Sequence, residues 1–148
     1  METAWMGGFG MKYKKFEDHF VVIMETGESI LEGLTELCEK ENIGHGMVSG
    51  IGGTKYLRLG IWDRFENYYK YIEKDQGSME ILSLTGNISR RDGKPNLHLH
   101  VTASDDSFAS FGGHLDKGIV QNMLEIYVYP HAEVIDRKPY QYWWFMDI

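Results

Sequence analysis

The chain has 148 residues, which is the usual size of one domain, and its formal net charge is −7 at pH 7. Hydrophobic residues make up 43% of it and aromatic residues 14%, which is enough to fill a core and excludes disorder as the main state. Because DNA affinity rests largely on Lys and Arg releasing counterions, an acidic chain is not expected to bind DNA tightly over its whole surface.

The single cysteine, Cys38, excludes an internal disulfide and a zinc site built from cysteines. One unpaired thiol suits a reducing compartment, so we expect a cytoplasmic protein. No segment approaches the ~18 uninterrupted apolar residues that a membrane helix needs, and we expect no membrane partner.

Residues 1–15 are rich in glycine and lysine and lack an apolar signal core, so they are predicted to form a flexible N-terminal lead-in. Residues 16–148 are predicted to form one domain that ends in an aromatic tail. Residues 20–24 (FVVIM) are typical of a buried strand.

A segment with apolar residues at helical spacing follows this strand: Ile30, Leu31, Leu34, Leu37 and Cys38. Acidic residues lie between them, so the segment is predicted to be an amphipathic helix of roughly four turns. Thr26 is the candidate N-cap, and Asn42 and Gly44 are candidate terminators.

The rest of the chain is predicted to be strands punctuated by glycine. A strand at 46–53 would end in a tight turn, 56–62 and 68–73 would form a hairpin, and further strands would occupy 79–89, 97–104, 108–115 and 123–129. A last segment at 133–136 has a weak pattern. Many strands and one clear helix predict an α+β fold with a mostly antiparallel sheet and one main packed helix.

Residues 97–101 (LHLHV) carry the strongest sign of chemistry. Side chains on a strand alternate between faces, so His98 and His100 would share one face, about 7 Å apart along the strand. His114 follows the Gly112–Gly113 pair and would reach the same face if the two strands form a hairpin.

Three imidazoles around a tetrahedral ion leave one position open, which is typical of catalytic or ligand-exchanging zinc. Other divalent transition metals also accept imidazole. The alternative interpretation is a polar strand face without a metal. His19, His45 and His131 are single histidines, for which ligation is the less favoured interpretation.

Glu80 heads an apolar strand, and two interpretations are open for it: a buried structural carboxylate or a general base near the metal. Arg90, Arg91 and Lys94 form the one notable basic cluster; a solvated turn is favoured over a nucleic-acid contact. The aromatic residues of the tail, from Tyr140 to Phe145, fit core or lid packing, or alternatively a subunit interface.

Four motifs in a fixed order resemble the plant and prokaryote conserved (PPC) domain, also called the PD1-like DNA-binding motif. They are Glu80–Ser89, Asp92–Pro95, His98–His100 and Gly112–Leu115. The resemblance extends over roughly residues 16–129.

The resemblance implies an α+β fold assembled as a homotrimer. For prokaryotic stand-alone members it implies a zinc site formed by three histidines, at the positions of His98, His100 and His114. The Arg-Gly-Arg-Pro arms of plant members do not occur in this sequence.

Three functions follow as hypotheses. The first is a trimeric, metal-binding regulatory or interaction module, associated with DNA through a partner. The second is a metal-dependent hydrolase or lyase that acts on a small polar substrate at the open metal position. The third is direct DNA binding by a basic patch formed only in the trimer.

Overall fold

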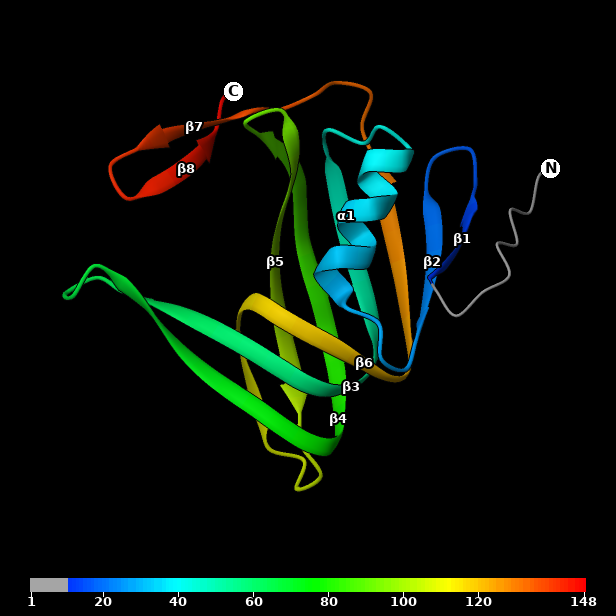
Figure 1. Cartoon of the computed structure of the whole chain (residues 1–148), viewed down its shortest axis with the longest axis vertical. Coiled ribbons are helices and arrows are strands. Elements are labelled where there is room, and N and C mark those ends of the chain that lie inside the picture. The colour runs from blue at the N-terminus through cyan, green and yellow to red at the C-terminus, as the bar shows by residue number, and fades with distance from the viewer. Residues whose placement is uncertain (1–10) are drawn as a thin grey trace.

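The computed structural model describes residues 11–148 as eight strands and one helix (Figure 1). The elements are β1 (Lys12–Lys15), β2 (Phe20–Glu25), α1 (Ile30–Lys40), β3 (Gly46–Asp63), β4 (Tyr68–Arg91), β5 (Lys94–Ser104), β6 (Ser110–Pro130), β7 (Arg137–Tyr140) and β8 (Trp143–Met146). The predicted α+β class with a mostly antiparallel sheet and one helix is confirmed.

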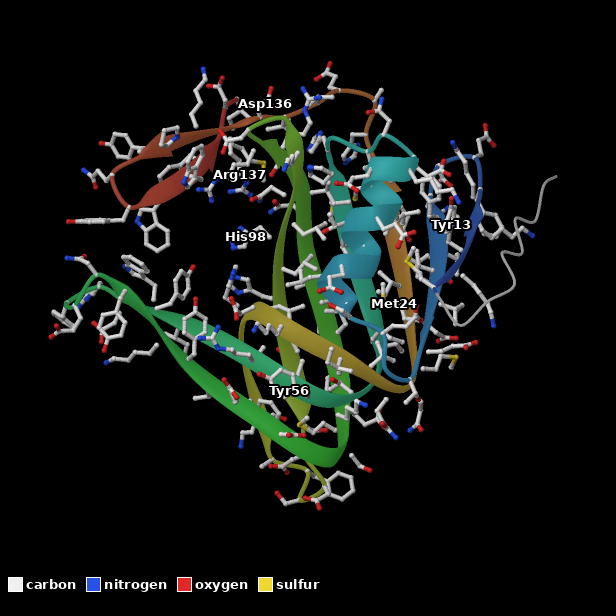
Figure 2. The ribbon with its side chains drawn as sticks, in the orientation of Figure 1. Tyr13, Met24, Tyr56, His98, Asp136 and Arg137 are labelled. Atoms are coloured by element: carbon white, nitrogen blue, oxygen red, sulfur yellow. The ribbon has the colours of Figure 1, made fainter. Side chains whose placement is uncertain are left out.

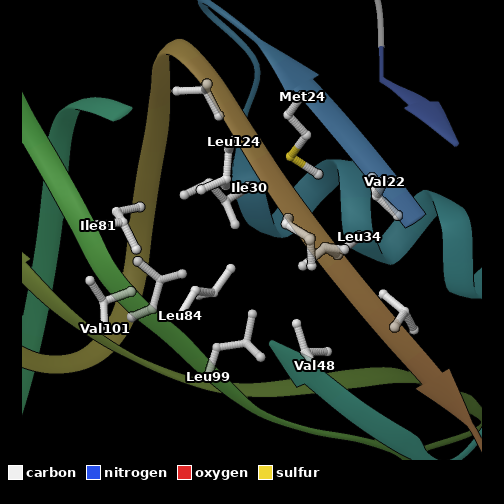
Figure 3. Packing of buried hydrophobic residues seen from close by; sticks show 14 of the residues in the cluster. Val22, Met24, Ile30, Leu34, Val48, Ile81, Leu84, Leu99, Val101 and Leu124 are labelled. Carbon is white, nitrogen blue, oxygen red and sulfur yellow. The ribbon is translucent and has the colours of Figure 1, made fainter. Parts of the chain in front are cut away.

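One antiparallel sheet has the strand order β1–β2–β6–β3–β4–β5, and β5 also pairs with β6. Strands β3, β4, β5 and β6 therefore close into a ring at one end of the molecule. Helix α1 packs against β5 and β6, and Gly33 of the helix lies against Met24 of β2. Figure 3 shows side chains of the core between these layers, including Leu34 from the helix and Leu84 and Leu99 from the sheet.

The predicted helix is present, but it starts at Ile30 and has 11 residues, about three turns. The N-cap is Ser29, whose hydroxyl accepts a hydrogen bond from the Glu32 amide, and not Thr26. The Thr26 hydroxyl instead accepts a hydrogen bond from the amide of Asn122 in β6. Asn42 follows the helix with φ of 54°, as expected of a terminating residue.

The predicted tight turn at the end of 46–53 is wrong, because the chain continues without reversal through Gly53 to Asp63. Register shifts between Gly50 and Gly52 and again before Tyr56 bend the strand there. Gly52 has φ of +150°, and a Cβ on it would lie 2.2 Å from the Met123 carbonyl oxygen. Glycines that resemble turn residues in the sequence thus mark β-bulges within a long strand.

Strands β4 and β6 likewise join segments that the sequence predicts to be separate. The hairpin of residues 56–62 with 68–73 is confirmed and forms the outer part of β3 and β4, which extends away from the helix in Figure 1. Residues 133–136 form no strand, although Asp136 makes an isolated bridge with Arg90.

Both ends of the chain add strands. Residues 1–10 of the predicted lead-in lie outside the described residues, and its last four residues form β1, which pairs with β2. The aromatic tail forms the hairpin of β7 and β8 (Figure 1). Within residues 11–148, no helix has the length and apolar character needed to cross a membrane.

Candidate metal centre

His98, His100 and His114 come together on one surface of the β5–β6 hairpin. His100 lies directly opposite His114 in the register of the two strands, and His98 precedes His100 by two residues on β5. Leu99 between them is fully buried, so both β5 histidines face away from the core.

The three imidazoles form a nearly equilateral cluster. Their ring centroids lie 5.2 Å (His98–His100), 5.3 Å (His98–His114) and 5.5 Å (His100–His114) apart. One nitrogen from each ring lies within 4.8 Å of the other two. The sequence prediction that these residues share one face is therefore confirmed at the level of geometry.

The donor set and spacing fit a tetrahedral zinc ion. Two nitrogens bound at about 2.05 Å to one such ion lie about 3.3 Å apart, and the Nε2 atoms of His98 and His100 lie 3.3 Å apart. Within the described chain, the Nδ1 atom of His114 is buried without a hydrogen-bond partner. An imidazole with an unused nitrogen is available either to ligate a metal or to hold a bridging water.

The surroundings favour neutral imidazoles, which is the form that binds metals. Burial lowers the pKa of His98 to about 4, and the neighbouring His114, Arg137 and His100 add to the decrease. Burial and the proximity of His100 also lower the pKa of His114, although Asp116 opposes this.

Close backbone packing holds β4 and β5 together beside the site. Gly86 of β4 lies opposite Leu99, and a Cβ on Gly86 would lie 2.0 Å from the carbonyl oxygen of His98. Gly113 has the same role on the other side, since its Cβ would lie 2.9 Å from the Gly60 carbonyl oxygen. Glycines at these positions let the strands that carry the histidines approach their neighbours.

A cavity of about 680 Å³ opens over the three histidines. Its floor is the histidine cluster, and its walls come from the outer part of β3 and β4 and from the β7–β8 hairpin. Figure 2 shows His98 in the space between that hairpin and the β3–β4 extension. The aromatic residues that line the cavity are Trp62, Tyr69, Tyr142, Trp143 and Trp144.

The C-terminal hairpin acts as a wall of this cavity, which agrees with the lid interpretation of the aromatic tail. The ring of Trp143 lies 4.5 Å from that of Trp62 on β3. Tyr140 and Phe145 also belong to the hairpin, but they are exposed and contact each other edge to face, with 5.9 Å between ring centroids.

Arg137 fixes the hairpin to the sheet. Its Nε donates to the Ser89 hydroxyl at 2.7 Å, one Nη to the Asn87 side-chain oxygen at 2.9 Å, and the other Nη to the Trp144 carbonyl oxygen at 2.7 Å. Arg137 also lines the cavity, beside His98 (Figure 2). Burial and the charge of Arg91 lower its pKa.

Glu80 is neither buried nor near the histidines, so both interpretations made from the sequence are wrong in placement. Met79 and Ile81 are buried, and strand alternation turns Glu80 outward to solvent. On β4 it lies five residues from Thr85, the partner of His100, which is roughly 15 Å along the strand. It does not line the cavity.

The basic cluster forms the turn between β4 and β5, as expected for a hairpin loop. Arg90 pairs with Asp136 at 3.3 Å, and Arg91 stacks its guanidinium on the Trp144 ring at 3.8 Å. Lys94 is exposed. Two of the three candidate nucleic-acid contacts are therefore directed at the C-terminal segment.

The other histidines and the cysteine lie elsewhere. His19 contacts Asp18, His45 packs against His131 with 4.6 Å between ring centroids, and none of the three belongs to the cluster. Cys38 is buried, and burial raises the pKa of its thiol to about 12, so it is an unreactive core residue.

The sequence contained no signal for Arg137 as a residue of this site. It lies in a short polar segment with no motif, between 23 residues (from His114) and 39 residues (from His98) away along the chain. The one available hint was the aromatic run beside it, because a terminal cluster of tryptophans needs a surface to cover.

The fold is that of a PPC-type domain, as comparison with a family profile and with solved structures shows. The profile of the family described as the Plants and Prokaryotes Conserved (PCC) domain matches residues 11–131. The chain belongs to this family, which confirms the resemblance inferred from the four motifs.

Solved structures give the same result. A PPC protein from Pyrococcus horikoshii is 33% identical, covers 93% of this chain and of its own, and superposes with a TM-score of 0.77. A "putative DNA-binding protein" from Bacteroides thetaiotaomicron is 28% identical, with coverage of 93% and 96% and a TM-score of 0.89. A metal-containing protein from Archaeoglobus fulgidus is 28% identical, with coverage of 95% and 99% and a TM-score of 0.78. Among functionally curated proteins, none matches this chain.

Proposed function

We propose that the chain is a homotrimeric PPC protein that binds one zinc ion per subunit through His98, His100 and His114 and serves as a regulatory module. The main support for the metal site is the triangle of three imidazoles, whose nitrogens lie within 4.8 Å of one another. The metal-containing relative from Archaeoglobus fulgidus, at 28% identity, supports it. Zinc is preferred because three neutral imidazoles and an open fourth position are a common zinc arrangement.

The trimer is supported by an exposed apolar surface on the sheet face that α1 does not cover. Met47 and Ile51 of β3 are 58% and 56% exposed, although their neighbours Val48 and Gly50 are buried. Tyr129 of β6 lies directly opposite Met47 and extends the surface across the sheet. Contiguous apolar patches of this kind mark interaction surfaces.

This apolar surface lies on the same face as the metal centre. Tyr129, Met47, Asn87 and His98 follow one another across β6, β3, β4 and β5 in register. Directly opposed residues of antiparallel strands share a face. Subunits packed on the apolar surface would thus border the cavity.

Metal content tests the proposal. Protein purified without a polyhistidine tag is expected to hold about one zinc ion per chain by elemental mass spectrometry, and His100→Ala is expected to lose it. His19→Ala is the matched control, because His19 is also on the surface and is outside the cluster. Zinc retained in His100→Ala, or no metal in any of the three proteins, would contradict the proposal.

A metal-dependent hydrolase or lyase is the second candidate, favoured by the cavity of about 680 Å³ above the histidines. A zinc ion there would supply a Lewis acid to a substrate oxygen. Glu80 is too distant to move protons in such a reaction, so this candidate requires a different proton carrier, such as the Tyr69 hydroxyl at the cavity wall.

The proposed regulatory role includes an association with DNA, because the relative from Bacteroides thetaiotaomicron is described as a "putative DNA-binding protein". A subunit with a net charge of −7 and with Arg90 and Arg91 engaged in other contacts supports an indirect association better than direct binding. We place the protein in the cytoplasm, which the single buried thiol of Cys38 suits.

A further inference from the structure

We propose that the cavity above the histidines binds a small organic anion with a planar apolar body, whose charged group lies between the metal and Arg137. This inference rests on the proposed metal site and names the class of ligand that the site takes. It concerns residues of the C-terminal hairpin, which follows the segment that matches the family profile.

The cavity differs in charge from the rest of the molecule. The chain is acidic overall, with 22 Asp and Glu against 15 Lys and Arg. Yet the described residues that line the cavity include Arg91 and Arg137 and no carboxylate. A divalent ion on the histidines would add two further positive charges. A positive cavity in an acidic protein concentrates anions at that place.

Arg137 brings a positive charge to the wall of this cavity. All three of its hydrogen bonds go to neutral acceptors: a hydroxyl, a side-chain amide and a backbone carbonyl. Within the described part of the chain it makes no ion pair, and its half-buried position is unfavourable enough to lower its pKa. Of the five N–H donors of a guanidinium, two remain free. Such a fork is suited to two oxygens of a carboxylate or phosphate.

Arg137 also lies close to the histidine cluster. Arg137 and His98 line the same cavity, and Arg137 donates a hydrogen bond to the side-chain oxygen of Asn87, the residue of β4 that lies directly opposite His98. An anion that ligates a metal on the three histidines can therefore accept hydrogen bonds from Arg137 at the same time. Arg91 is held at the edge of the same cavity by its stacking on Trp144.

The walls of the cavity suit a planar apolar ligand body. The cavity walls that β3 and the C-terminal hairpin contribute are aromatic. The ring centroids of Trp62 and Trp143 lie 4.5 Å apart. Flat π surfaces favour a planar apolar body over a flexible polar one. The tryptophans also report on occupancy, because a ligand beside them changes their fluorescence.

The experiment titrates the zinc-loaded full chain with 1-naphthoate, 1-naphthyl phosphate and the neutral 1-naphthamide, and follows tryptophan fluorescence and calorimetric heat. At least one of the two anions is expected to bind about tenfold more tightly than the amide, or better. The better of the two distinguishes a carboxylate ligand from a phosphate ligand. Equal affinity for all three probes, or no binding of any, overturns the inference.

The variants Arg137→Gln and Arg91→Gln test the residues separately. Each is expected to weaken anion binding about tenfold or more and to leave naphthamide binding within about twofold. Arg90→Gln is the matched control, because Arg90 is adjacent and pairs with Asp136 but does not line the cavity. Arg91→Gln keeps the test valid if Arg137→Gln loosens the hairpin. Unchanged anion affinity in Arg91→Gln and Arg137→Gln overturns the assignment.

Zinc content is measured in every sample, so the two proposals can fail separately. One zinc per chain without a preference for anions overturns the ligand and leaves the metal site intact. An anion preference in a protein that binds no zinc overturns the metal site and supports the arginine contacts alone.

Discussion

At the residue scale, the clearest feature is that His98 is half-buried although it faces away from the core. Its pKa is lowered to about 4, from an ordinary value of about 6.5, first by burial and then by its charged neighbours. The low pKa keeps the imidazole neutral for a metal across the physiological range.

The same pKa predicts how the stability of the zinc-free protein depends on pH. Between pH 6.5 and 4 the unfolded chain binds a proton at His98 that the folded chain does not, so the free energy of unfolding must fall as pH falls through this range. Above pH 6.5 His98 is neutral in both the folded and the unfolded chain, so it no longer lowers the free energy of unfolding. Urea unfolding of zinc-free wild type and His98→Asn, measured at pH 7 and pH 5, is expected to show a smaller loss in the variant. Identical losses in the two proteins would contradict the assignment.

The residue patterns also show which parts of the site the sequence could predict. His98, His100 and His114 were predictable because strand alternation is strictly periodic and a glycine pair precedes His114. Arg137 was not, because its role depends on where the chain after β6 returns to the sheet. That path is set by tertiary contacts with Ser89 and Asn87 and has no local signature.

At the element scale, short apolar segments separated by glycines combine into long bent strands. The sequence predicted the segments correctly but placed a turn near Gly52, because a bulge and a turn use the same residue types. The long strands β3 and β4 contribute both to the inner core and to the wall of the cavity, so their continuity connects the core to the site. The hairpin of β7 and β8 completes that wall.

The contact between β4 and β5 at Gly86 gives a prediction for these elements. Gly86→Ala places a methyl group 2.0 Å from the His98 carbonyl oxygen, so the strands must separate. We expect the free energy of unfolding to decrease by at least about 2 kcal/mol and the zinc affinity to decrease with it. Denaturant unfolding and a zinc titration measure the two effects.

Gly77→Ala is the control, since a Cβ there would have no atom within 4 Å. It is expected to leave stability within about 0.5 kcal/mol of wild type. Equal effects of the two substitutions would mean that the close approach of β4 and β5 is unimportant.

At the scale of the whole molecule, one face of the sheet carries both the apolar surface and the metal centre, while α1 covers the other (Figure 1). The helix pattern predicted which residues are buried beneath it. The composition alone could not predict the exposed apolar surface, because Met47 and Ile51 look like core residues in the sequence.

Assembly through this surface predicts the effect of a charge on it. Ile51→Glu is expected to convert the proposed trimer to monomers, because three carboxylates would be buried at the proposed interface, while the monomer tolerates the change at an exposed position. Phe65→Glu, at the exposed tip between β3 and β4, is expected to remain trimeric. Light scattering during size-exclusion chromatography measures the mass; a trimeric Ile51→Glu protein would place the interface elsewhere.

The central claim, three histidines around one metal, is tested most directly by zinc K-edge X-ray absorption on the purified protein. We expect three imidazole nitrogens and one further light atom at about 2.0–2.1 Å from the zinc, and loss of one imidazole in His114→Ala if that protein retains metal. A spectrum without imidazole scattering, or one dominated by carboxylate oxygens, would contradict it.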